Sequence, residues 1–292
     1  MIKEPDILCI GAVLWDIIGR ATPQMRVGSD VPGKISRIPG GVALNIAMAI
    51  QAYGLKPALM SVVGRDDEGE DLMRACARME IIVDHIYRSD DLPTDRYMAI
   101  EGANGLIAAV ADAHSLEAAG DKILRPLKGG ALDGWSGIIA LDGNLTHDLL
   151  GGIAHEPAFA RADLRIAPAS PGKAERLKPF LTHSNATLYV NLEEAGLLMH
   201  CAFEASAQAA SAMRAQGLKR VLVTDGANAA SVATADEIFS EIPPKVTVSR
   251  FTGAGDTFMA AHIAAEVKGS TGRASLIEAL DATAVYISGE TY

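Results

Sequence analysis

Residues 251–258 place an acid directly after a run of small residues, in the order Phe-Thr-Gly-Ala-Gly-Asp-Thr-Phe. An amphipathic stretch follows at 259–267, so the segment is expected to open a helix. Glycines let a backbone approach a ligand closely, and the first amides of a helix are unpaired donors at the positive end of its dipole. The amides of Gly253, Ala254 and Gly255 could therefore bind phosphate oxygens, while Asp256 accepts the proton of an attacking hydroxyl. This combination is what phosphoryl transfer to an alcohol requires.

Taken alone, the segment is equally compatible with an ordinary glycine-rich turn capped by Asp256. Two further segments favour phosphoryl transfer over a simple turn. Residues 40–47 read Gly-Gly-Val-Ala-Leu-Asn-Ile-Ala, and residues 64–69 read Gly-Arg-Asp-Asp-Glu-Gly. In this order and separation, they resemble the first signature of the ribokinase-like (PfkB) family of carbohydrate and nucleoside kinases, and 251–258 resembles the second. The resemblance covers nearly the whole chain. It implies that ATP is the phosphoryl donor and that Asp256 is the catalytic base.

The resemblance also implies an acceptor site. Asp16 lies five residues after Gly11, at the expected end of the first strand, and is similar to the family's acceptor-binding aspartate. An ionised carboxylate can accept two hydroxyl hydrogen bonds, which suits a vicinal diol. Gly40, Gly41 and Asn45 match the family's substrate loop, although a pair of glycines before a helix is by itself only a tight turn.

A nucleotide site is implied by two more matches. Asn191 and Glu194 resemble the family's Asn-x-x-Glu motif, which positions Mg²⁺, often through water; hard oxygen ligands suit this ion. The same pair could instead, or in addition, cap a helix. Thr224 and Gly226 resemble a nucleotide-binding turn that normally reads Thr-x-Gly-x-x-Gly, but Ala229 stands at the last glycine.

Arg250 departs from the family pattern. Many relatives carry an aspartate six residues before the catalytic one, where it helps to bind an activating potassium ion. A guanidinium cannot ligate a cation, and its fixed charge could replace one. We therefore expect no requirement for a monovalent cation. The alternative is that Arg250 simply points to solvent.

Two stretches favour a particular acceptor. Residues 140–145 and 167–177 look like the middle of pseudouridine kinases, where an Asp-Asn-Leu strand end precedes a Pro-x-Ser-x-x-Lys segment, and residues 108–112 are similar as well. Ala167 departs from that subgroup, in which the position is usually acidic. The expected activity is thus phosphorylation of the 5′-hydroxyl of pseudouridine. The alternatives are a kinase of ribose, fructose or a keto-sugar acid, and a sensor that binds without transfer.

Short apolar runs alternate with helical stretches along the chain, as at 42–53, 70–79 and 205–216. This alternation predicts a doubly wound, mainly parallel sheet flanked by helices, with ligands at the carboxyl ends of the strands. The expected buried strands are 7–10, 58–63, 137–141, 164–167, 187–190 and 221–224. The whole chain, 1–292, is expected to be a single ribokinase-like domain.

One segment breaks the alternation. Residues 96–101 and 106–111 flank Gly-Ala-Asn-Gly, and Asn-Gly is a strong hairpin signal. With 16–20 and 34–38, the hairpin could form a small separate sheet. The family resemblance implies that this sheet, within about 12–38 and 94–113, is a lid over the substrate and the contact of a homodimer. The alternative is a surface hairpin without function.

Composition limits the remaining classes. Of the 292 residues, 49% are hydrophobic and 5% aromatic, which indicates a core of Ala, Val, Ile and Leu. A net charge of −10 without a basic run argues against a nucleic-acid polymer as partner. No apolar run approaches the roughly 20 residues of a membrane span. Three scattered cysteines, with no secretory signal, indicate a reducing cytoplasm.

Overall fold

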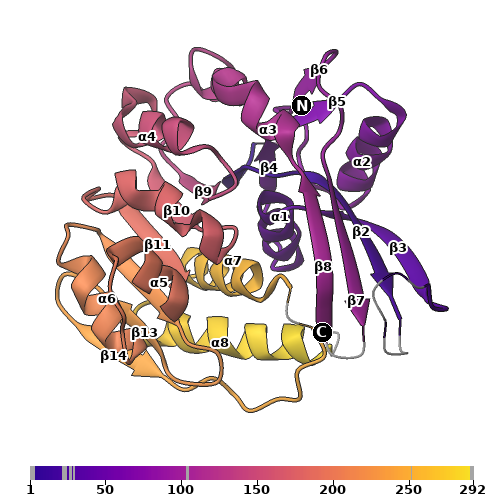
Figure 1. Ribbon diagram of the computed structural model, residues 1–292. Helices are drawn as coiled ribbons and strands as arrows, with labels where there is room; N and C mark the ends of the chain where they lie inside the picture. Colours follow the sequence, from indigo (N-terminus) through magenta and orange to yellow (C-terminus); the bar gives the residue numbers. More distant parts are fainter. Residues whose placement is uncertain are drawn as a thin grey trace.

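The computed structural model describes residues 4–21, 25, 28, 30–102, 105–250 and 252–289 (Figure 1). Within these ranges the chain forms one large sheet flanked by helices and a smaller sheet that stands beside it.

The large sheet has eight strands in the order β14-β13-β12-β11-β10-β9-β1-β4. All neighbouring pairs from β4 to β12 are parallel, whereas β13, near one edge, is antiparallel to both of its neighbours, β12 and β14. This arrangement confirms the predicted doubly wound, mainly parallel sheet. Its strands are β1 (Ile7–Ile10), β4 (Pro57–Met60), β9 (Ile138–Asp142), β10 (Asp163–Ala167), β11 (Ala186–Asn191), β12 (Arg220–Thr224), β13 (Ala230–Ala233) and β14 (Ile238–Glu241).

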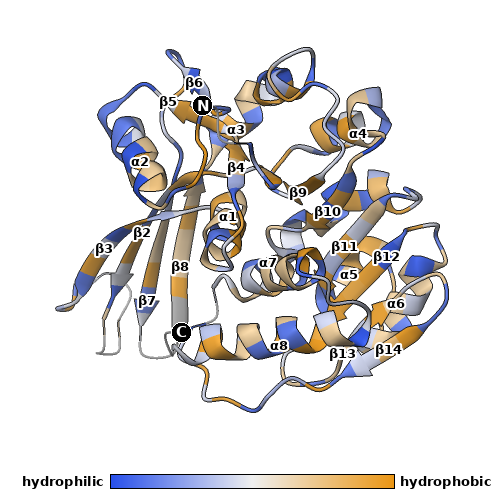
Figure 2. Cartoon of the chain, turned by 180° about the vertical axis from the view of Figure 1, so that it is seen from behind, coloured by the Kyte–Doolittle hydropathy of each residue, from blue (hydrophilic) through white to orange (hydrophobic). Residues whose placement is uncertain are grey.

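Both faces of this sheet are buried, which explains why its strands are continuous apolar runs. Successive side chains of a strand point to opposite faces, so Ile7 and Cys9 enter one core cluster while Leu8 and Ile10 enter the other. All four side chains are fully buried. In Figure 2 the strands of this sheet are largely in the hydrophobic colours.

Helices cover the two faces separately. The core cluster that contains Ile7 draws on α1 (Val42–Ala52), α2 (Asp67–Arg78), α7 (Ala254–Val267) and α8 (Arg273–Ser288). The cluster that contains Leu8 draws on α3 (His114–Ala119), α4 (His147–His155), α5 (Leu192–Met199) and α6 (Ser206–Arg214). Three 3₁₀ segments join the second cluster: η1 (Gly120–Leu127), η2 (Pro157–Phe159) and η3 (Pro171–Phe180).

The small sheet has four strands in the order β3-β2-β7-β8. The β2 and β7 strands are parallel, while β2–β3 and β7–β8 are antiparallel pairs. The strands are β2 (Leu14–Arg20), β3 (Lys34–Gly40), β7 (Arg96–Gly102) and β8 (Gly105–Asp112). The predicted hairpin and separate sheet are therefore present; Ala103 and Asn104 of the hairpin turn lie outside the described residues.

Three sequence expectations are corrected. The strand predicted over 58–63 is split, because the chain leaves the large sheet after Met60 and β5 (Val62–Gly64) pairs with β6 (Tyr87–Ser89) instead. The helix predicted over 70–79 begins earlier, at Asp67, because the Asp66 carboxylate caps it by accepting the Gly69 amide at 2.7 Å. Asp16 is not at the end of β1 but inside β2 of the small sheet.

Candidate active site

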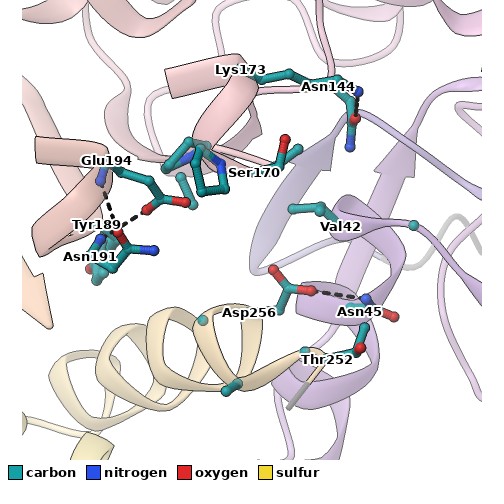
Figure 3. Close-up of a pocket in the computed structure, with 18 of the residues that line it drawn as sticks. Val42, Asn45, Asn144, Ser170, Lys173, Tyr189, Asn191, Glu194, Thr252 and Asp256 are labelled. Atoms are coloured by element: carbon teal, nitrogen blue, oxygen red, sulfur yellow. Dashed lines mark hydrogen bonds between the residues drawn. The ribbon is translucent and has the colours of Figure 1, made fainter. Parts of the chain in front are cut away.

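A cavity of about 690 Å³ lies at the carboxyl ends of the parallel strands, the edge at which doubly wound sheets bind ligands. Residues from three places line it: the small sheet, the segments that follow β9 to β12, and the first turns of α1 and α7. The lining includes Asp16 and Tyr97 from the small sheet, Asn144, Lys173, Asn191, Glu194 and Thr224 from the large one, and Asn45 and Asp256 from the two helices. Figure 3 labels Asn144, Lys173, Asn191, Glu194, Asn45 and Asp256 among them.

The start of α7 is built from glycine and small residues, as predicted. Gly253 is the N-cap in the left-handed conformation, with φ 85°, and a Cβ there would lie 2.5 Å from the Tyr286 hydroxyl. No side chain of the described residues caps this end, so the amides of Gly253, Ala254 and Gly255 remain available at the positive end of the helix dipole. All three residues line the cavity.

Asp256 lies in the first turn of α7 and is held by the first turn of α1. Its Oδ2 accepts a hydrogen bond from Asn45 Nδ2 at 2.9 Å (Figure 3). Burial raises the pKa of Asp256 to about 7, and the carboxylates of Asp142, Asp16 and Glu194 act in the same direction. The side chain is therefore ready to exchange a proton near neutral pH.

Two glycines on the acceptor side allow close approaches that a side chain would block. A Cβ at Gly40 would lie 2.0 Å from the Asp16 carboxylate, and one at Gly41 would lie 2.5 Å from the carbonyl oxygen of Ala12. Gly41 also has a φ of 96°, which side chains rarely adopt. Burial raises the pKa of Asp16 to about 6. Asp16 and Gly41 line the cavity, whereas Gly40 is not among the described lining residues and lies against the Asp16 carboxylate.

The predicted Asn-x-x-Glu pair forms a complete capping box at the start of α5. The Glu194 amide donates to Asn191 Oδ1, and the Asn191 amide donates to Glu194 Oε2, both at 2.8 Å. Burial raises the pKa of Glu194 to about 7. Both side chains also line the cavity. The pair that caps α5 is therefore the same pair that the sequence analysis assigns to Mg²⁺. Thr224 ends β12 at the same cavity, and Gly226 follows in a turn with φ 56°.

The donor set fits Mg²⁺ only in part. Glu194 keeps one carboxylate oxygen outside the capping box, and oxygen is the ligand that this ion prefers. Among the described residues there is no group of three His, Cys, Asp or Glu side chains arranged to hold a metal. An ion at this place would therefore take most of its ligands from water and phosphate.

Arg250 lies outside the cavity wall. Its guanidinium stacks on the Tyr286 ring, 4.8 Å from the ring centre, and the Tyr286 hydroxyl donates to the Thr252 carbonyl at 3.0 Å. The positive charge thus stands near the start of α7 without entering the site.

The sequence analysis includes Asp142 in residues 140–145 but assigns it no role at the site. It is fully buried at the end of β9, and its carboxylate accepts the amides of Ala12 at 2.8 Å and Asn144 at 2.7 Å. A Cβ at Gly11 would lie 2.2 Å from the Asp142 Cβ. An acid ending an apolar strand was the available signal, because such a group must find buried donors.

A buried network behind the cavity was also missed. Tyr189 lines the cavity, and its hydroxyl bonds to Arg165 at 3.0 Å and to His262 at 2.9 Å. Glu266 of α7 pairs with both Arg165 and Arg220. The network therefore ties the helix that carries Asp256 to strands β10 to β12.

No described helix is both long and apolar enough to span a membrane.

Comparison with known proteins gives concordant matches. The model of the pfkB family carbohydrate kinases matches residues 4–289. Among sequence relatives, the uncharacterized sugar kinase YeiI of Escherichia coli K12 is 29% identical, over 94% of this chain and 75% of the relative. The pseudouridine kinase of the same organism is 27% identical, over 88% and 83%. Among solved structures, a carbohydrate kinase from Agrobacterium tumefaciens superposes with a TM-score of 0.82 at 25% identity, covering 97% of this chain and 90% of that one.

Proposed function

Because the chain belongs to the pfkB family of carbohydrate kinases, which are phosphotransferases with an alcohol acceptor, we propose that it transfers the γ-phosphoryl group of ATP to the 5′-hydroxyl of pseudouridine. The contact between Asn45 and Asp256 carries the proposal. This hydrogen bond holds the Asp256 carboxylate, whose pKa is raised, in the cavity lining and beside the uncapped amides of α7.

Asp256 acts as the general base. Asn45 occupies one of its carboxylate oxygens, which leaves the other to accept the proton of the attacking hydroxyl. The amides of Gly253, Ala254 and Gly255 stabilise the negative charge on the phosphoryl oxygens. These amides are fixed before the substrate arrives, so their orientation costs little during the reaction.

Asp16 and Gly41 orient the ribose of the acceptor, together with Asn45. The Asp16 carboxylate accepts hydrogen bonds from the two ring hydroxyls, and Gly41 allows the sugar to approach the backbone. On the other side, Asn191, Thr224 and Gly226 contact the nucleotide. Glu194 and Asn191 would hold Mg²⁺ through water, and the ion would neutralise charge on the phosphates.

The cavity surface supports an uncharged nucleoside rather than an acidic sugar. Leu14, Val42 and Tyr97 give an apolar surface near Asp16 that suits a base. Three carboxylates, those of Asp16, Glu194 and Asp256, line the same cavity and would repel the carboxylate of a keto-sugar acid. The two segments that resemble pseudouridine kinases supply the lining residues Asn144 and Ser170.

The small sheet serves as a lid and as a dimer contact. One of its faces carries Asp16 and Tyr97 towards the cavity. The strand register places Ile35, Met98, Ile100 and Val110 together on the opposite face, where between 41% and 78% of each residue is exposed. Light scattering should give a mass twice that of the monomer for the wild-type protein. The double variant Met98→Lys, Val110→Lys should give the mass of the monomer. A wild-type protein that is monomeric at micromolar concentration would contradict the dimer contact.

The acceptor is tested by turnover with ATP and Mg²⁺ on pseudouridine, uridine, adenosine, ribose, fructose and ketodeoxygluconate. We expect kcat/KM to be highest for pseudouridine. Turnover only with a free sugar would retain the kinase and overturn the acceptor. Binding of an acceptor without turnover on any of them would favour the sensor.

A further inference from the structure

His262 is a buried titratable residue that the proposed transfer does not use. It lies on α7, six residues beyond Asp256. Its Nδ1 is 2.9 Å from the Tyr189 hydroxyl of β11, and its Nε2 is 3.3 Å from the Ser275 hydroxyl of α8. Burial lowers the pKa of His262 to about 3, so the imidazole is neutral and carries one N–H. One ring nitrogen therefore donates a hydrogen bond and the other accepts one.

The partners on the two sides of the ring decide which nitrogen carries the hydrogen. Arg165 can only donate, and its Nη1 donates to the Tyr189 oxygen at 3.0 Å. The Tyr189 hydroxyl then donates its single hydrogen to His262 Nδ1. On the other side, the Ser275 hydroxyl donates to the Gly272 carbonyl at 2.8 Å and so accepts from His262 Nε2. These five residues form a hydrogen-bond relay in which each hydrogen has one acceptor.

The relay meets α7 on the face that packs on the large sheet. Phe258, His262 and Glu266 recur every four residues, so they lie on one face of the helix. The Tyr189 ring packs edge-on against Phe258 and His262, with ring centres 6.4 and 5.6 Å apart. Glu266 pairs with Arg165 of the relay at 2.6 Å. Together these contacts fix how α7 is turned about its axis.

Asp256 lies on another face of the same helix, where it contacts Asn45 of α1. A helix turns by about 100° per residue, so Asp256 and His262 lie roughly 120° apart around the axis. A rotation of α7 would therefore move Asp256 against Asn45 and turn the amides of the first turn away from the cavity. Tyr189 also lies two residues before Asn191 on β11, so one side chain links the strand of the expected Mg²⁺ site to the helix of the expected base.

We propose that Tyr189 is a positioning residue for the transfer: through His262 it holds α7 in the rotation that directs Asp256 and the amides of the first turn at the reacting groups. The Tyr189 ring lines the cavity, but its hydroxyl is taken up by Arg165 and His262 and does not serve a ligand. Neither Tyr189 nor His262 exchanges a proton during the transfer. This inference rests on the proposed kinase function.

The test compares Tyr189→Phe with Tyr87→Phe, a control that removes the hydroxyl of a half-buried tyrosine that is not among the described lining residues. Tyr189→Phe keeps the ring that packs on α7 and removes only the hydrogen bonds of the hydroxyl. A misplacement of about 1 Å by a change far from the chemistry can cost about 100-fold in rate. We expect kcat to fall about tenfold to 100-fold for Tyr189→Phe, KM for ATP and for the acceptor to change less than about threefold, and the control to match wild type.

A double variant distinguishes one shared hydrogen bond from two separate effects. His262→Phe should lower kcat as Tyr189→Phe does, and the double variant should be no worse than either single variant, because both remove the same bond. His262→Asn should recover part of kcat, since its amide oxygen can accept the Tyr189 hydroxyl in place of Nδ1. Losses that multiply, a kcat for Tyr189→Phe within about twofold of wild type, or a rise in KM that accounts for the whole loss would overturn the positioning role.

Nuclear magnetic resonance tests the relay without turnover. The imidazole ¹⁵N resonances of His262, assigned by their absence in His262→Asn, should show the tautomer protonated at Nε2. The amide resonances of Gly253 and Gly255 should move in Tyr189→Phe and stay in place in Tyr87→Phe. A hydrogen on Nδ1, or glycine amides that do not move, would overturn the inference. If the wild-type protein transfers no phosphoryl group to any acceptor, the kinase proposal fails, while these resonances still decide whether Tyr189 positions α7.

Discussion

Replacing the catalytic carboxylate should make the protein inactive and more stable. Asp256→Asn keeps an oxygen that can accept the Asn45 hydrogen bond but removes the charge. A pKa raised from 3.8 to about 7 means that ionisation of this group opposes folding. Each unit of pKa shift corresponds to 1.36 kcal/mol, so above pH 7 the ionised Asp256 lowers the free energy of unfolding by at most about 4 kcal/mol. Because water in the cavity screens the charge, we expect a gain of about 2 kcal/mol.

This gain depends on pH in a defined direction. The folded wild-type protein binds the Asp256 proton more tightly than the unfolded chain does. The extra stability of the protonated form is complete below the unfolded pKa of 3.8 and is lost as the pH rises through about 7. The advantage of Asp256→Asn should therefore be largest at pH 8 and much smaller at pH 5.

Thermal unfolding without ligand measures the effect. For a chain of this length an unfolding entropy of about 0.6 kcal/mol/K converts 2 kcal/mol to a rise in Tm of about 3 °C. Asp148→Asn is the control, because this exposed acid in the first turn of α4 should lose a small dipole interaction and lower Tm slightly. A lower Tm for Asp256→Asn at pH 8, or a difference that does not change at pH 5, would refute the electrostatic reasoning.

Three further predictions follow from the same geometry. The value of kcat/KM should fall as the pH drops below about 7, because Asp256 becomes protonated in the free enzyme, and a pH–rate profile that is flat from 5 to 8 would contradict this. Glu266→Ala should lower the free energy of unfolding by about 3 kcal/mol, measured by urea titration, because two arginines lose their buried partner; a change below 1 kcal/mol would be inconsistent with the network. Replacing sodium with potassium should leave kcat unchanged if the charge of Arg250 stands in for a cation, and strong activation would disprove that role.

The sequence predicts the large sheet well because both of its faces are buried. Each predicted strand of β1 and β9 to β12 ends within two residues of the observed one, since a fully buried strand is a continuous apolar run between polar residues. The hairpin strands were equally clear from their turn signal. The strand predicted over 58–63 failed because a single apolar run gives no sign that its two halves pair with different partners.

The motifs predicted which residues would gather at the site, but not how they contact one another. Asn45 and Asp256 are 211 positions apart, and nothing local indicates that one donates to the other. The close approach of Gly40 to Asp16 likewise depends on the pairing of β2 with β3. Such contacts are set by strand register and helix packing, which a single sequence does not encode in any short window.

Transfer of label from ATP carrying ³²P at the γ-position tests whether Asp256 supports phosphoryl transfer to the nucleoside. Wild-type protein and Asp256→Asn are each incubated with Mg²⁺ and pseudouridine, and the labelled products are separated and identified. We expect label on the 5′-oxygen of the nucleoside with wild-type protein, and transfer reduced about 10²–10⁴-fold by the substitution. Label released only as inorganic phosphate, or transferred equally well by Asp256→Asn, would contradict this expectation.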